Sequence, residues 1–160
     1  MTRSAWLAGL IPFNAQSNGR YVHSKRICSV QHKTIYLCGP INGCTDEECK
    51  DWRELVKGLW SGPTIDPMRR DYRGKEHESV NQIVEFDKID VMNSDVILVN
   101  YDKPSVGTSM EVLYAWERGK LIVVVSKWGK TGLSPWLLYH SHGISTSFES
   151  AIRFIEEMSK

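Results

Sequence analysis

The sequence predicts a doubly wound α/β fold, in which helices cover both faces of a five-stranded parallel sheet. Short apolar runs and helical patterns alternate along residues 34–158 and give five strands, four of which are followed by a helix. The apolar runs are continuous rather than alternating, which is typical of strands buried on both faces. The chain has 160 residues, of which 41% are hydrophobic, and this is enough for a single domain with one core.

The first strand and the first helix have clear boundaries. The run Thr34–Cys38 is apolar and ends at the turn Gly39-Pro40. Thr45–Glu48 has the form of a capping box, and apolar residues spaced along one helical face over residues 52–59 follow it. Gly62 ends this helix.

The second unit contains a carboxylate in an unexpected place. A short strand is predicted at residues 64–68, and a helix begins near Ser79 after a charged loop. One apolar face of that helix is formed by Val80, Ile83 and Val84. The same face continues to Asp87, and a carboxylate there is costly unless it is paired or functional. Asp90 is expected to be a solvated companion of Asp87.

The third unit is built around the most continuous strand, Asp95–Tyr101. A turn over residues 104–107 leads into a helix expected at residues 108–118, which Gly119 ends. The remaining elements are a strand at Leu121–Val125, a long loop, a weak strand at residues 143–147 and an amphipathic helix that ends near Met158.

Right-handed crossovers between parallel strands make a flavodoxin-like or Rossmann-like sandwich the expected topology. In such sheets the ligand lies at the carboxyl ends of the strands. The candidate site is therefore formed by the loops that follow Cys38, Met68 and Tyr101.

The charge is distributed unevenly along the chain. Residues 1–33 contain five basic and no acidic residues, whereas residues 34–160 contain 15 basic and 19 acidic residues. We predict a poorly ordered extension at residues 1–33, with a transit peptide as the alternative, and a catalytic domain at residues 34–160. A net charge of +1 argues against a nucleic-acid polymer as partner, and the absence of a long apolar run argues against a membrane span.

The cysteines and histidines do not have the spacing of a metal site. No two of the four cysteines form a C-x2-C pair, and His140 and His142 lack a third ligand at a suitable spacing. Free thiols in a cytoplasmic protein are expected, with a disulfide as the alternative.

Several familiar nucleotide and hydrolase motifs are absent from the strand ends. The sequence contains no Walker A loop, no G-x-G-x-x-G at the start of a helix and no G-x-S-x-G elbow. Polar and glycine-containing loops remain. Their candidate substrate-binding residues are Gly39, Pro40 and Asn42 in the first loop, Asp66, Arg69, Arg70 and Arg73 in the second, and Ser105, Gly107, Ser109 and Met110 in the third.

Glu111 allows two interpretations. Residues 108–111 form a capping box of their own, in which the Glu111 side chain would bond only the backbone of Thr108. Its position after a glycine-containing turn, at the ligand end of the sheet, favours a functional carboxylate instead.

These motifs resemble the nucleoside 2-deoxyribosyltransferase family, including its phage-type members. The resemblance covers residues 34–158 and rests on Tyr36–Ile41 (YLCGPI), on the spacing from Asp87 to Asp95, and on residues 104–115 (PSVGTSMEVLYA) followed by Gly119-Lys120. It implies a flavodoxin-like fold, a homo-oligomer, no metal or cofactor, and cleavage of the N-glycosidic bond of a 2-deoxynucleoside or its 5′-monophosphate.

The resemblance also implies roles for three residues. Glu111 matches the nucleophile, which forms a deoxyribosyl ester that an acceptor base or water resolves. Asp87 matches the acid/base carboxylate, and Tyr36 matches a tyrosine that orients the nucleophile. Hydrolysis alone is the rival activity, and a non-catalytic nucleotide sensor is the rival from another class.

Ser105 departs from the pattern of members that act on free nucleosides, which carry an aspartate at this position. The branch that hydrolyses deoxynucleoside 5′-monophosphates has a serine here, near the phosphate. However, the serine and arginine in the first loop of that branch are matched by Pro40 and Asn42. The cluster Arg69, Arg70 and Arg73 could supply charge for a phosphate, or could form a solvated loop paired with Asp71 and Glu76.

A neighbouring subunit often completes the pocket in this family. Trp136, Tyr139 and His140 are candidates for such a contribution because they lie in an aromatic loop. Ordinary packing of Trp136 under the loop is the alternative.

Overall fold

The computed structural model describes residues 32–160, so all but the last two residues of the predicted N-terminal extension lie outside the described part. Five parallel strands form one sheet in the order β2-β1-β3-β4-β5. This is the flavodoxin-like strand order, and it confirms the predicted fold class. The strands are β1 (Ile35–Cys38), β2 (Thr64–Ile65), β3 (Val96–Asn100), β4 (Leu121–Val125) and β5 (Gly143–Ser145).

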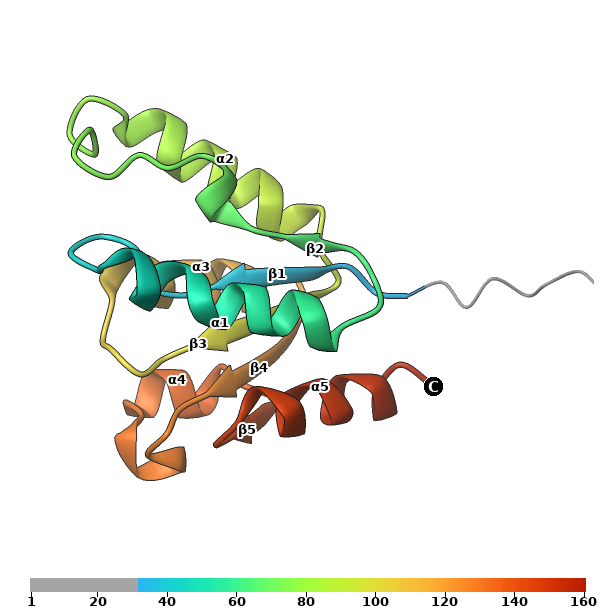
Figure 1. Ribbon diagram of the computed structural model, residues 1–160. Helices are drawn as coiled ribbons and strands as arrows, with labels where there is room; N and C mark the ends of the chain where they lie inside the picture. The colour runs from blue at the N-terminus through green and yellow to red at the C-terminus, as the bar shows by residue number, and fades with distance from the viewer. Residues whose placement is uncertain (1–31) are drawn as a thin grey trace, which may run out of the picture.

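Helices cover both faces of the sheet (Figure 1). They are α1 (Asp46–Leu59), α2 (Val80–Met92), α3 (Val106–Trp116), α4 (Pro135–Tyr139) and α5 (Phe148–Glu157), with short 3₁₀ turns η1 (Pro67–Arg69) and η2 (Gly129–Gly132). In β1, Ile35 and Leu37 pack into the core shared with α1 and α5. Tyr36 and Cys38 point to the other face, where α3 packs. None of the helices within residues 32–160 is long and apolar enough to cross a membrane.

Three predicted boundaries are wrong, each because a side chain caps the backbone. Strand β2 ends at Ile65, since the Asp66 carboxylate accepts the Met68 N–H at 2.9 Å and starts η1. Helix α3 begins two residues earlier than expected, because Ser105 rather than Thr108 is its N-cap. The loop predicted after β4 contains η2 and α4, and Ser134 caps α4.

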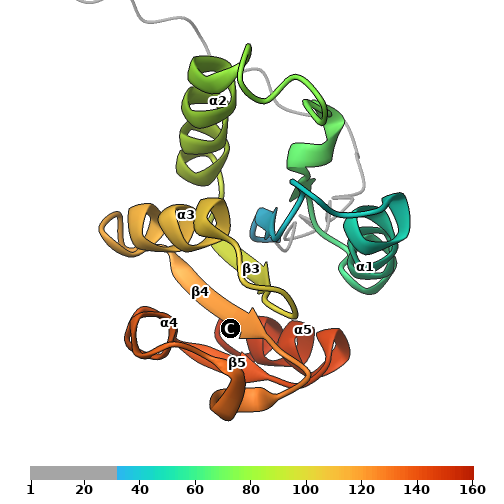
Figure 2. The same ribbon diagram turned by 90° about the vertical axis from the view of Figure 1, so that its left-hand side faces the viewer.

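Helix α2 differs from its prediction in orientation. Val80 and Val84, expected on a buried face, have 53% and 46% of their surface exposed. The buried residues of α2 are Asp90 and Val91 at its C-terminal end. Figure 2 shows the rest of the helix extending past α3 and away from the sheet. The helix therefore forms one wall beside the loops at the carboxyl ends of β1 and β3.

Strands β1 and β3 are neighbours in the sheet. The chain leaves β1 toward the face covered by α1 and leaves β3 toward the face covered by α3. The loop after β1 starts at Gly39, where an added Cβ would lie 2.8 Å from the Trp52 ring and 3.3 Å from the Asn100 Cβ. Only glycine allows this close approach, which places the loop beside the end of β3.

Candidate active site

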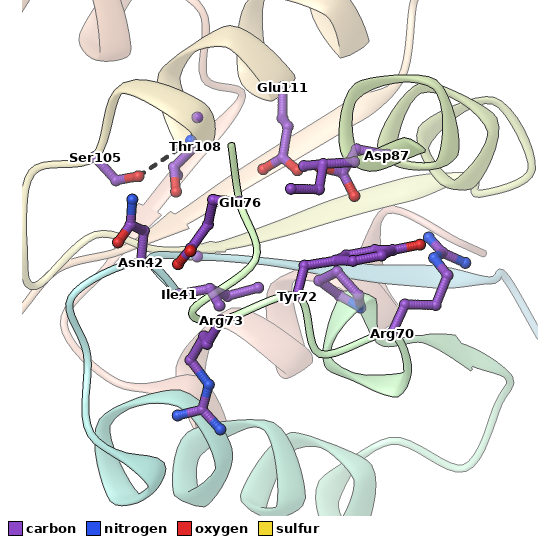
Figure 3. Close-up of a pocket in the computed structure, with 14 residues that line it drawn as sticks. Ile41, Asn42, Arg70, Tyr72, Arg73, Glu76, Asp87, Ser105, Thr108 and Glu111 are labelled. Carbon is purple, nitrogen blue, oxygen red and sulfur yellow. Dashed lines mark hydrogen bonds between the residues drawn. The ribbon is translucent and has the colours of Figure 1, made fainter. Parts of the chain in front are cut away.

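A cavity of about 280 Å³ lies at the carboxyl ends of β1 and β3, between the loop after β1, the η1–α2 segment and the start of α3 (Figure 3). Eight residues predicted from the sequence line it: Gly39, Asn42, Arg70, Arg73, Asp87, Ser105, Gly107 and Glu111. Six further lining residues were not predicted: Ile41, Pro67, Tyr72, Glu76, Ile83 and Thr108.

Glu111 is held at the base of this cavity by two donors from β1. The Tyr36 hydroxyl donates to Oε1 at 2.7 Å, and the Cys38 thiol donates to Oε2 at 2.9 Å. The capping-box interpretation of Glu111 is wrong, because the Thr108 N–H is accepted by the Ser105 hydroxyl at 3.3 Å. The carboxylate is therefore turned toward the sheet and the cavity rather than back along its own helix.

Burial controls the protonation of this group and its donors. Desolvation raises the pKa of Glu111, while the hydrogen bonds from Cys38 and Tyr36 and the charge of Arg53 lower it. Burial, followed by the negative charge of Glu111, raises the pKa of Tyr36 and the pKa of Cys38 well above their usual values. Both donors consequently keep their protons.

Asp87 faces Glu111 from α2 (Figure 3). Burial and then the charge of Glu111 raise the pKa of Asp87 to about 7, although the charge of Arg70 lowers it. A hydrogen bond between the two carboxyl groups raises the pKa of Asp87 and lowers the pKa of Glu111. Burial thus raises the pKa of both carboxyl groups, and the titration of each depends on the other.

The arginines of the second loop are already paired within the chain. Asp90, predicted to be solvated, is only 3% exposed and is bound by Arg69 at 2.5 Å and by Arg70. Arg73 binds Asp71 and Asp46, each at 2.6 Å. The hydrogen bonds and charge of Arg73 lower the pKa of Asp71 to about 2. Arg70 and Arg73 still line the cavity, but each already has an acidic partner.

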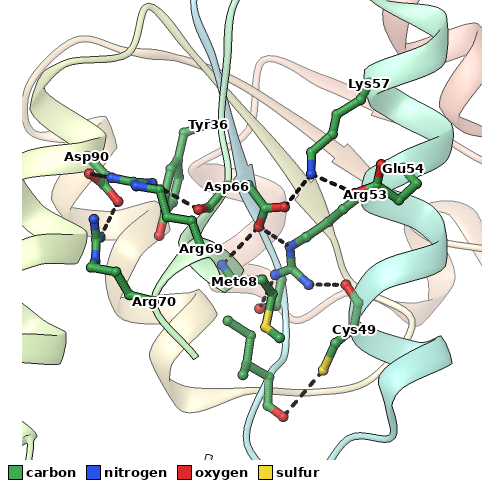
Figure 4. A network of polar contacts seen from close by, with 12 residues as sticks. Tyr36, Cys49, Arg53, Glu54, Lys57, Asp66, Met68, Arg69, Arg70 and Asp90 are labelled. Carbon is green, nitrogen blue, oxygen red and sulfur yellow. Dashed lines mark hydrogen bonds and ion pairs between the residues drawn. The ribbon is translucent and has the colours of Figure 1, made fainter. Parts of the chain in front are cut away.

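A second polar network lies under the loop after β1 (Figure 4). Arg53 is fully buried, and its Nε lies 3.3 Å from an Asp66 carboxylate oxygen. Its terminal nitrogens donate to the Cys49 carbonyl and, at 3.2 Å, to the Gly39 carbonyl. Lys57 binds the other Asp66 oxygen at 2.7 Å. The network joins α1, the end of β2 and the loop that lines the cavity.

Several predicted site residues lie outside the cavity. Asp66 and Arg69 are occupied by the ion pairs just described, and Pro40 is buried. Ser109 and Met110 lie on another side of α3, where they line a second cavity of about 270 Å³ together with Trp136 and His140. The third aromatic candidate, Tyr139, is 71% exposed. None of the five residues on this side of α3 reaches the first cavity of its own chain.

No cluster of three or more His, Cys, Asp or Glu within residues 32–160 is arranged to hold a metal ion. Cys38, Cys44 and Cys49 are free thiols, whereas Cys28 lies outside the described residues.

The fold and the cavity place the chain among flavodoxin-like α/β proteins whose ligand site lies where neighbouring parallel strands lead to opposite faces. The model of the nucleoside 2-deoxyribosyltransferase family matches residues 35–143, and the chain belongs to this family. The membership indicates an enzyme of the deoxyribosyltransferase or N-glycosidase kind. No curated relative matches the chain.

Three solved structures share the fold. A 2-deoxyribosyltransferase from Bacillus psychrosaccharolyticus is 14% identical with a TM-score of 0.60, over 73% of this chain and 88% of that one. A conserved protein from Enterococcus faecalis V583 is 16% identical with a TM-score of 0.60, over 79% and 98%. A CMP N-glycosidase from Clostridium botulinum is 15% identical with a TM-score of 0.52, over 79% and 97%.

Proposed function

We propose that this protein cleaves the N-glycosidic bond of 2-deoxynucleosides or their 5′-monophosphates and transfers the deoxyribosyl group to an acceptor base. The observation that carries the proposal is the Glu111 carboxyl group, held by two donors from β1 and faced by Asp87, whose pKa is raised to about 7. One carboxyl group is thus ready to attack while the other is ready to protonate a leaving group.

The reaction has two displacements. An oxygen of Glu111 bonds to the anomeric carbon as the carbon–nitrogen bond breaks, and the departing base takes the proton of Asp87. A nitrogen of the acceptor base then attacks the same carbon, Asp87 accepts the proton, and the ester bond to Glu111 breaks. Two inversions give net retention. If water attacks the ester instead, the reaction is hydrolysis.

The names of two fold relatives support this reaction class. One acts as a 2-deoxyribosyltransferase and another as a CMP N-glycosidase. The family that the chain belongs to is also described by deoxyribosyl transfer.

Ser105 supports acceptance of a 5′-monophosphate, since a neutral hydroxyl at the cavity wall does not repel a phosphate as a carboxylate would. Arg70 and Arg73 add positive charge to the wall, although each is already paired, and Glu76 adds negative charge. The substitution Ser105→Asp tests the assignment, because aspartate caps a helix as well as serine does. We expect a selective loss of kcat/KM for monophosphates; an equal loss for nucleosides would remove Ser105 from phosphate recognition.

A substrate panel tests the proposed function. The protein is incubated with deoxynucleosides and with deoxynucleoside 5′-monophosphates, each with and without a second free base. An exchanged nucleoside or nucleotide supports transfer, and release of free base alone would convert the enzyme to a hydrolase. Binding of nucleotides without either product would favour the sensor alternative.

We also propose that the protein is a homo-oligomer in which the aromatic segment of one chain approaches the cavity of another. Trp136 and Tyr139 are 68% and 71% exposed, and α2 exposes further apolar side chains beside the cavity wall. Large exposed apolar surfaces of this kind mark sites of protein association.

A further inference from the structure

The proposed reaction assigns roles to Glu111, Asp87 and Tyr36 but none to Cys38. The Cys38 side chain is fully buried and touches the nucleophile. Its sulfur lies 2.9 Å from Glu111 Oε2 and 3.9 Å from the Thr108 carbonyl oxygen. The closer acceptor is also the charged one, so the thiol proton is directed to the carboxylate.

The two donors come from one rigid strand. Tyr36 and Cys38 are two residues apart in β1, so both side chains point to the face on which α3 packs. Each carboxylate oxygen of Glu111 accepts one of them. Two donors from one rigid strand, one on each oxygen, thus hold the plane of the carboxylate, and without the thiol β1 would hold only Oε1.

The thiol acts only as a donor here. Burial and the nearby charge of Glu111 raise the pKa of Cys38, which keeps the thiol neutral. A thiol is a weaker donor than a hydroxyl. It therefore orients Oε2 and, together with the Tyr36 hydroxyl, lowers the pKa of the Glu111 carboxyl group.

We propose that Cys38 is a positioning residue, whose thiol fixes the orientation of the Glu111 carboxylate jointly with the Tyr36 hydroxyl. The inference rests on the proposed function and adds to it a residue that acts through the nucleophile.

Four groups from three elements face Glu111. Tyr36 and Cys38 come from β1, Asp87 comes from α2, and the buried cation Arg53 comes from α1. Substitution of Cys38 leaves the other three groups in place. A change in the titration of Glu111 in a Cys38 variant therefore reports on the thiol itself.

The test compares the pH dependence of kcat and KM in Cys38→Ala and Cys38→Ser. For Cys38→Ala we expect kcat to fall about tenfold with little change in KM, and the acid limb to move up by about one pH unit, because the carboxylate loses a donor. Cys38→Ser should restore kcat toward the wild-type value and place the acid limb at or below the wild-type position. The matched control is Cys49→Ala, which removes another buried thiol, 3.6 Å from the Ile41 carbonyl oxygen, and should leave the acid limb unchanged.

A second measurement does not depend on turnover. The Glu111 carboxyl carbon is followed by ¹³C NMR as a function of pH in the wild type and in Cys38→Ala, and an upward shift of its titration supports the proposal. An unchanged titration overturns it, even if kcat falls, since the loss would then come from packing. If the wild type shows no turnover but the titration shifts, the proposed function fails while the contact between Cys38 and Glu111 stands.

Discussion

At the residue scale, the chemistry of the site depends on two carboxyl groups with different environments. Glu111 accepts two hydrogen bonds from β1, which lower its pKa against the effect of burial. Asp87 is partly buried, and burial and the charge of Glu111 raise its pKa to about 7. In the proposed reaction the pair supplies a nucleophile and an acid, the two roles that two-carboxylate glycosidic chemistry requires.

The raised pKa of Asp87 predicts a pH-dependent cost in stability. Because the pKa is about 7 in the folded chain and 3.8 ordinarily, the folded state binds the proton more tightly, and stability falls as pH rises between these values. We expect Asp87→Asn to be more stable than the wild type at pH 8 by about 1–2 kcal/mol, a value reduced for partial exposure to solvent. The difference should disappear near pH 4.

Urea unfolding at the two pH values measures this difference. Asp51→Asn is the control, since Asp51 is an exposed carboxylate on α1. If Asp87→Asn follows the wild type at both pH values, the proton does not reside on Asp87.

A substitution of Glu111 tests its proposed role as the nucleophile. We expect Glu111→Gln to lose turnover by at least about a thousandfold, because an amide cannot form the ester intermediate. The variant should keep its fold, since the amide oxygen can still accept one hydrogen bond from β1 and the NH2 group can donate to the Tyr36 hydroxyl oxygen. Product assays together with circular dichroism check both parts, and retained turnover would exclude Glu111 as the nucleophile.

At the element scale, a buried ion network connects structural stability with the shape of the cavity. Arg53 on α1 reaches Asp66 after β2 and the Gly39 carbonyl after β1. Asp66 in turn caps η1, which leads to the arginines that hold Asp90 on α2. Two loops of the cavity therefore depend on a single buried guanidinium.

Removing this guanidinium should be strongly destabilising. Arg53→Met leaves Asp66 without a buried partner and removes the donor to the Gly39 carbonyl, so we expect a loss of about 3–5 kcal/mol in the free energy of unfolding. Lys50→Ala is the matched control, because its pair with Asp46 is exposed and should be worth less than about 1 kcal/mol. Equal effects in urea unfolding would mean that the Arg53 network contributes nothing beyond a surface pair.

At the scale of the whole molecule, helix α2 exposes several apolar side chains to solvent. Val84 is 46% exposed, and Ile89 and Met92 are 49% and 50% exposed. Such apolar exposure along one helix is compatible with burial against a second copy of the chain.

A charge placed on this helix tests the assembly. We expect the wild type to sediment as an oligomer and Val84→Glu to shift it toward the monomer, because a buried carboxylate without a partner opposes association. Gln82→Glu adds the same charge at another exposed position of α2 and is the control. A monomeric wild type would contradict the proposed homo-oligomer.

Local sequence patterns predicted the structure correctly where a pattern has only one structural interpretation. The continuous apolar strands gave the parallel sheet, and the capping box at Thr45 gave the start of α1 correctly. They failed where two choices were locally equivalent. Ser105 and Thr108 are both suitable caps, and in the folded chain the Ser105 hydroxyl accepts the Thr108 N–H while Glu111 turns to β1.

The sequence alone also misplaced the buried charge of α2. Asp87 and Asp90 lie three residues apart, so helical periodicity puts both near one face and cannot say which is buried deeper. Arg69 and Arg70 bind Asp90 from a loop about twenty residues away, and this contact decides its burial. Tyr72 and Glu76 also line the cavity, and the sequence did not predict this. An irregular loop has no hydrophobic periodicity that would indicate its path.

The sequence by itself determined the order of the five strands, the flavodoxin-like class and eight of the residues that line the cavity. These follow from apolar periodicity, which is a property of neighbouring residues. The tertiary structure decided the protonation of those residues and the partners of each arginine. Burial, hydrogen bonding and charge act between segments far apart in the chain, so the raised pKa values of Glu111 and Asp87 exist only in the folded molecule.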